Sequence, residues 1–132
     1  MNMVLTKLFG TKSERETKKL VPLINEINQF YETLSSKSDE DLANRTHELR
    51  EIVINSKETK KESLPDNISR QERQDSILKV EQDVLDSIMV ESYALVKETC
   101  RRMCGSSWRV SGQDTVWEMI PYDVQIMGAV TL

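Results

Sequence analysis

The apolar residues between positions 20 and 34 recur every three or four residues. This spacing places them on one face of an α-helix and leaves the charged and amide residues on the other. The sequence therefore predicts an amphipathic helix, with a kink or a restart near Val21, because Pro22 removes a backbone hydrogen bond inside it. The apolar set is Leu20, Leu23, Ile24, Ile27, Phe30, Tyr31 and Leu34.

Two further helices are indicated after this one. Ser38-x-x-Asp41 is a capping-box pattern, in which the two side chains satisfy free amides at a helix start. A second apolar pattern, over about residues 75–103, predicts the most buried helix. Gly105 ends it, because glycine readily adopts the left-handed conformation that closes a helix. The helix after Ser38 uses Leu42, Leu49, Ile52 and Val53.

Residues 55–74 are almost entirely polar, and only Leu64 and Ile68 are apolar there. Such a segment cannot bury enough apolar surface to fold independently. The sequence therefore predicts a flexible inserted loop between the second and third helices.

The last part of the chain carries turn signals. Trp108 and Trp117 flank Ser111-Gly112, which favours a small β-hairpin within residues 106–118. Residues 122–131 are predicted to form a short helix. Together these elements indicate a mainly α fold, and 132 residues fit a single domain.

Charge and hydropathy exclude several classes of protein. The net charge of −4 argues against a general nucleic-acid binder. The sequence has no apolar run of about 18 residues, so no membrane-spanning helix is predicted. The N-terminus also lacks the basic start, long apolar core and cleavage site of a signal peptide. A cytoplasmic location is therefore expected.

No catalytic residue or metal site is predicted. Cys100 and Cys104 lie one helical turn apart, without the further ligands that a structural zinc site needs, and are assigned to packing as reduced thiols. His47 is the only histidine and lies in a polar helix, so it is expected at the surface. No partner pattern supports a nucleophilic triad.

Residues 1–10 form a predicted amphipathic segment with two open interpretations. Its apolar side chains either pack on the protein's own core or lie at a membrane interface, where a basic flank favours anionic lipid. The residues that would contact the membrane are Val4, Leu5, Lys7, Leu8 and Phe9.

Residues 119–132 contain the run Pro121-Tyr122-Asp123-Val124-Gln125. Proline suits the turn before a helix, and a carboxylate in the first helical turn is electrostatically favourable. The Gln125 side chain carries one carbonyl acceptor and one amide donor. This pair matches the N6 amine and N7 acceptor of adenine. An ordinary helix-capping or solvent-facing role is the alternative for Gln125.

The chain resembles the N-terminal region of the SecA preprotein translocase ATPases. The resemblance implies that the chain is the N-terminal part of a helicase-type (RecA-like) α/β motor domain, in which Gln125, Tyr122 and Met119 contact the adenine of ATP. It covers most of the chain outside residues 55–74 and 106–118, through stretches at residues 5–15, 21–28, 38–50, 94–103 and 119–128.

The resemblance also implies partners and a location. In that family the full protein drives preproteins through a membrane channel and lies peripherally, with anionic lipid, on the cytoplasmic face of the inner membrane. A homodimer is a further possible assembly. Because the chain has no glycine-rich loop ending in Lys-Thr or Lys-Ser, the phosphate and Mg²⁺ sites are missing and no ATP hydrolysis is expected from it alone. The alternative function is a non-enzymatic helical module that binds a partner helix or a membrane surface.

Overall fold

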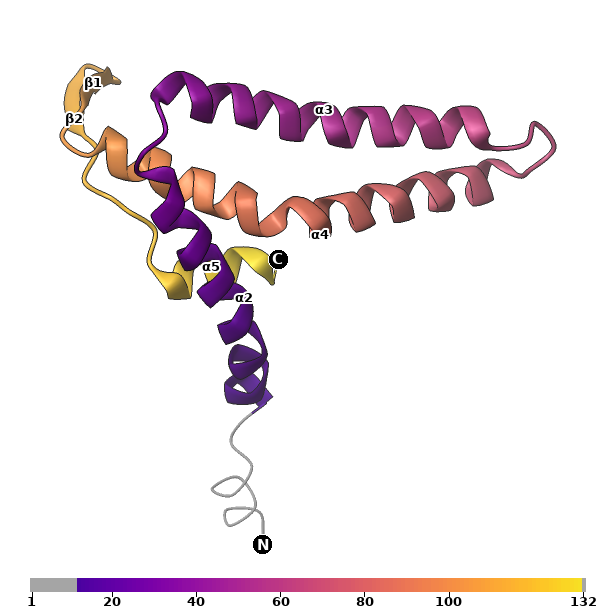
Figure 1. Ribbon diagram of the computed structural model, residues 1–132, viewed down its shortest axis with the longest axis horizontal. Coiled ribbons are helices and arrows are strands. Elements are labelled where there is room, and N and C mark those ends of the chain that lie inside the picture. Colours follow the sequence, from indigo (N-terminus) through magenta and orange to yellow (C-terminus); the bar gives the residue numbers. More distant parts are fainter. Residues whose placement is uncertain (1–11, 132) are drawn as a thin grey trace, which may run out of the picture.

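The computed structural model describes residues 12–131, and their side chains from residue 17 onward. It is mainly helical, which confirms the predicted class (Figure 1). The predicted segment 1–10 lies outside the described residues. The elements, in chain order, are α2 (Lys12–Leu34), α3 (Asp39–Ser63), α4 (Arg70–Met103), β1 (Ser107–Val110), β2 (Gln113–Val116) and α5 (Asp123–Val130).

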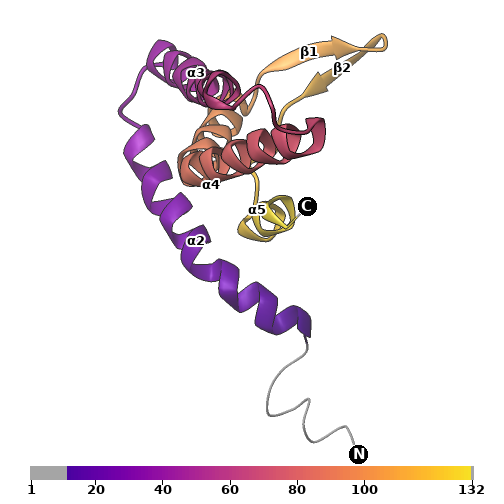
Figure 2. The same ribbon diagram turned by 90° about the vertical axis from the view of Figure 1, so that its right-hand side faces the viewer.

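Helices α3 and α4 form a long antiparallel hairpin, and the other elements gather at its open end (Figure 1). Helix α2 crosses α4, and α5 packs against α2 (Figures 1 and 2). The two short strands pair in antiparallel register, with Trp108 opposite Thr115 and Val110 opposite Gln113. None of the helices within residues 12–131 has an apolar stretch long enough to cross a membrane.

The core lies where α2 meets the open end of the α3–α4 hairpin. Ile27 is fully buried, which confirms the apolar face predicted for α2. Helix α2 continues through Pro22 without a restart. Four helices contribute to the buried set, which consists of Ile24, Ile27, Leu34, Leu42, Leu49, Ala94, Leu95 and Ile126.

The prediction of a loop over residues 55–74 is wrong for most of that range. Helix α3 continues to Ser63 and α4 already begins at Arg70, so the connection is only residues 64–69. Polar side chains support these helical turns because they pair with one another. Lys57 Nζ lies 2.6 Å from Glu81 Oε1 across the hairpin, and Lys61 pairs with Glu58 one turn away.

The predicted start of α3 and the predicted end of α4 are confirmed, whereas the start of α4 predicted near residue 75 is wrong, because this helix begins at Arg70. The Asp41 amide donates to Ser38 Oγ and the Ser38 amide to Asp41 Oδ2, both at 3.0 Å, as a capping box requires. Gly105 has φ +86° immediately after α4. Ser111 and Gly112 both have positive φ between β1 and β2, as a tight hairpin turn needs.

A second capping box was missed in the sequence. The Glu72 amide donates to Ser69 Oγ, and the Ser69 amide donates to Glu72 Oε2. The pattern Ser69-x-x-Glu72 is a recognisable helix start. It shows why α4 begins at Arg70, before the apolar positions of the helix appear.

Candidate functional site

The predicted adenine motif lies at the start of α5. Tyr122 is the residue before the helix and has extended backbone angles, with φ −75° and ψ 155°. Its backbone amide donates to Gln125 Oε1 at 2.8 Å. Gln125 therefore caps α5 from inside its first turn, in the way that a glutamine at this position does in a capping box.

All three predicted contact residues face solvent. Met119 is 47% exposed, Tyr122 is 74% exposed, and Gln125 is exposed as well. The hydrogen bond at the helix cap joins Gln125 to Tyr122, whereas no hydrogen bond within residues 12–131 joins either of them to Met119. The motif therefore forms an open surface and not an enclosed pocket.

Capping does not prevent Gln125 from reading a base. A side-chain carbonyl oxygen has two lone pairs, and the Tyr122 amide occupies one. Among the residues that the structure describes, Gln125 Nε2 has no hydrogen-bond partner. One acceptor site and the amide donor therefore remain available at the surface, which is the pair that adenine requires. The two interpretations of Gln125 are compatible.

Asp123 anchors this surface to the rest of the fold. Asn28 Nδ2 of α2 donates to both carboxylate oxygens, at 3.1 and 3.2 Å. Lys97 Nζ of α4 lies 3.2 Å from Asp123 Oδ1 and 2.6 Å from Asn28 Oδ1. The Asn28 amide and then Lys97 lower the pKa of the Asp123 carboxyl below its ordinary value, so this group stays charged at neutral pH.

The β-hairpin places Met119. The Trp117 indole donates to the Met119 carbonyl at 2.7 Å, and the Trp108 and Trp117 rings stack with centroids 6.0 Å apart. Backbone bonds from Gly105 to Trp117 and from Trp117 to Ser106 tie the hairpin to the end of α4. The segment before Pro121 is thereby held at two points.

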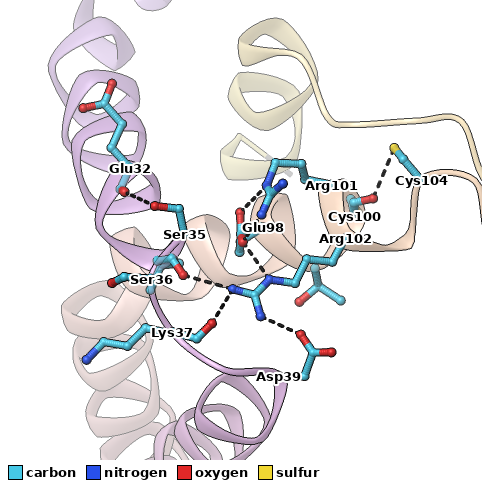
Figure 3. Close-up of polar contacts among 12 residues, drawn as sticks. Glu32, Ser35, Ser36, Lys37, Asp39, Glu98, Cys100, Arg101, Arg102 and Cys104 are labelled. Carbon is cyan, nitrogen blue, oxygen red and sulfur yellow. Dashed lines mark hydrogen bonds and ion pairs between the residues drawn. The ribbon is translucent and has the colours of Figure 1, made fainter.

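A second polar cluster joins α4 to the turn between α2 and α3 (Figure 3). Glu98 is 1% exposed and accepts from Arg101 at 2.6 and 2.8 Å and from Arg102 at 2.7 Å. Arg102 also donates to Asp39, to the Leu34 carbonyl at 3.0 Å and to the Lys37 carbonyl at 2.7 Å. Arg101 and Arg102 both pair with Glu98, and Arg102 also bonds to the turn, so the cluster ties α4 to the connection between α2 and α3.

A hollow lies between α3 and α4, away from the motif. Its volume is about 1010 Å³, and it is lined by residues of α3 and α4 together with Ser106. His47 is exposed on its rim and Cys100 is half-buried in its wall. Cys104 is exposed, with its thiol 3.5 Å from the Cys100 carbonyl. Within residues 12–131 no cluster of three His, Cys, Asp or Glu residues is placed to hold a metal ion.

Sequence reasoning missed Asn28, Lys97 and Glu98. Asn28 and Lys97 lie 69 positions apart in the chain, and each occupies an ordinary polar position of an amphipathic helix. Glu98 carried one usable signal, because the two arginines that follow it lie three and four residues away. Its burial has no signature in the sequence.

Comparison with known proteins points to one family. A family model described as "SecA DEAD-like domain" matches residues 5–132. The protein translocase subunit SecA of Chlorobaculum tepidum is 35% identical over the whole chain, and its namesakes from Chloroherpeton thalassium and Salinibacter ruber are 34% and 32% identical over 97% of it.

The chain spans about 14% of the length of these relatives. No solved structure matches it. The family match covers nearly the whole chain, including the capped start of α5 and the braced end of α4. The chain belongs to the SecA DEAD-like domain family.

Proposed function

We propose that this chain is the opening part of the RecA-like motor domain of an ATP-driven protein translocase, and that Gln125 contacts the adenine of ATP. The relatives are named as translocase subunits. The exposed amide of Gln125, with one carbonyl lone pair left free by the capping bond, is the observation that carries the proposal. Met119 and Tyr122 are exposed and are the residues that would supply apolar surface for the base.

The phosphates and Mg²⁺ need other residues. Phosphate binding in such motors requires a glycine-rich loop with a lysine, and residues 1–132 contain none. The chain alone therefore binds only the nucleoside part of ATP and does not hydrolyse it. In the complete translocase the same surface works beside the protein-conducting channel, on preproteins, at the cytoplasmic face of the membrane.

Gln125→Glu separates the two roles of this residue. Glutamate still accepts the Tyr122 amide and caps α5, but its ionised carboxylate has no donor for adenine N7. Losing a matched polar contact costs on the order of 1–3 kcal/mol, which is enough to abolish a weak nucleoside contact. Adenosine and guanosine titrations followed by amide NMR measure the effect.

The unsubstituted chain is expected to show adenosine-dependent shifts at Gln125 and Tyr122 and weaker ones with guanosine. Gln125→Glu should lose the adenosine shifts and keep its helix content. Gln29→Ala, an exposed glutamine of α2, is the control and should behave as the unsubstituted chain. Equal adenosine binding by Gln125→Glu contradicts the adenine contact.

We also propose that residues 1–10 contact anionic lipid through Val4, Leu5, Lys7, Leu8 and Phe9. Deleting these ten residues is expected to weaken sedimentation with phosphatidylglycerol vesicles, because it removes the apolar side chains that would insert and the positive charge of Lys7. Added salt should weaken binding of the intact chain by screening the charged contribution. Equal sedimentation of the two chains would remove the lipid role.

A second candidate function, a non-enzymatic helical interaction module, is favoured by the hollow between α3 and α4. Ile54, Leu85 and Val96 line it and are 40%, 42% and 54% exposed, so an apolar partner surface would find contacts there. The nucleoside titration distinguishes the two functions. A module of this kind is expected to bind adenosine no more tightly than guanosine.

A further inference from the structure

We propose that Asn28 and Lys97 are positioning residues for Gln125: through Asp123 they hold the first turn of α5, and with it the edge that meets adenine. The proposal rests on the proposed function, since it assigns the supports of that same surface. Neither residue lies in the 119–132 segment, and neither is suggested by the spacing of the sequence.

Helix α5 depends on tertiary contacts for its position. It has eight residues, and isolated helices shorter than about 12 residues are marginal in water. Ile126 is 3% exposed and holds one side of the helix in the core. Met127 and Val130 also pack against the core, so the apolar contacts of α5 all come after its first turn and do not hold that turn directly. A second attachment near the N-terminus is needed to set the direction of Gln125.

Asp123 provides that second attachment. It is the first residue of α5, two positions before Gln125. Both of its carboxylate oxygens accept from Asn28 of α2, and Oδ1 also accepts from Lys97 of α4. These contacts come from two different helices, so they restrict movement of the turn in more than one direction.

The two donors are themselves held in place. Lys97 has a side chain only 14% exposed, and its ammonium lies 5.3 Å from the centre of the Tyr31 ring. It also donates to Asn28 Oδ1, which orients the Asn28 amide so that its nitrogen faces Asp123. Asn28, Lys97 and Asp123 thus form a closed triangle of hydrogen bonds across α2, α4 and α5.

Exchanging the amide and the carboxylate between positions 28 and 123 tests this triangle. Asn28→Asp places a second carboxylate against Asp123 with one lysine between them, and it removes the amide donor. The double variant Asn28→Asp/Asp123→Asn exchanges amide and carboxylate, so that position 123 donates to position 28 and Lys97 still reaches both. Asn55→Asp, at an exposed asparagine of α3, is the matched control.

Two readouts are measured on the full chain by NMR. One is hydrogen exchange of the Tyr122 amide, which bonds to Gln125 and needs no ligand; the other is affinity for adenosine against guanosine. Asn28→Asp is expected to speed Tyr122 exchange and weaken adenosine binding by about fivefold, the loss expected for one hydrogen bond. The double variant should restore the Tyr122 exchange rate and the adenosine affinity to within about twofold of their values in the unsubstituted chain.

Two results overturn the proposal: Tyr122 exchange unchanged in Asn28→Asp, or a double variant that recovers thermal stability without recovering Tyr122 exchange. A purely structural role predicts the second result. Failure of the proposed function looks different, because the unsubstituted chain would then show no preference for adenosine. Tyr122 exchange would in that case still decide whether Asn28 and Lys97 hold Gln125.

Discussion

Ile27→Ala is expected to lower the free energy of unfolding by about 2–5 kcal/mol. Ile27 is fully buried at the crossing of α2 with the open end of the α3–α4 hairpin. Alanine removes apolar contacts and leaves a cavity that the surrounding helices only partly fill. Domains of this size have a total stability of about 5–15 kcal/mol. The expected loss is therefore a large fraction of the total stability. Urea unfolding followed by circular dichroism measures it.

Ile52→Ala is the matched control for this prediction. Ile52 lies in α3 and is 40% exposed, so the same substitution removes fewer buried contacts and places a good helix former in a helix. Its effect is expected to stay below about 1 kcal/mol. Similar losses for the two variants would show that the core does not lie where the structure has it.

Glu98→Gln is expected to lower the free energy of unfolding by about 2–3 kcal/mol at neutral pH. The neutral amide keeps the size of the side chain but removes the charge that accepts from Arg101 and Arg102. It also turns one acceptor group into a donor that faces the guanidinium groups. Because Arg102 also bonds to the Leu34 and Lys37 carbonyls, the effect should extend to the turn between α2 and α3.

The contribution of Glu98 should depend on pH. Hydrogen bonds from Arg101 and Arg102 lower its pKa from 4.5 to about 2, against the opposing effect of burial. A lowered pKa means that the stabilisation is complete above about pH 4.5 and is lost as the pH falls through about 2. The difference in stability between Glu98→Gln and the unsubstituted chain should therefore shrink over that window.

Glu58→Gln is the control for this pair of measurements. Glu58 pairs with Lys61 at 2.6 Å but its side chain is 56% exposed, and such surface pairs contribute little. Its unfolding free energy should change by less than about 0.5 kcal/mol at any pH. If Glu98→Gln lowers the free energy of unfolding by the same amount from pH 7 down to pH 2, the charge of Glu98 is not the cause of the loss.

Local patterns predicted the helices well where an apolar face was present. The repeat from Leu20 to Leu34 appears in the structure as the buried face of α2, and the Ser38–Asp41 capping box begins α3. The same reasoning failed at residues 55–74 because it treated low apolar content as absence of structure. Pairing across the hairpin, such as Lys57 with Glu81, supports helical turns that bury little apolar surface.

Some residues of the candidate site could be predicted from the sequence and others could not. Tyr122 and Gln125 were identified from a local run of residues, since a capped helix start and its exposed glutamine depend only on near neighbours. Asn28 and Lys97 were not, because hydrogen bonds between groups 69 residues apart leave no periodic trace in the sequence. The adenine contact stays a prediction that the nucleoside titration tests.

The sequence by itself determined the helical class, most of the helix ends, the hairpin turn and the membership in the SecA family. These features arise from interactions between residues close together in the chain, so the local spacing of residue types predicts them. Only the tertiary structure decided that Glu98 is buried with two arginines, that α3 and α4 extend as a paired hairpin, and that Asp123 is held from two helices. Each of these depends on which helix faces meet, and that follows from how the whole chain packs its apolar surface.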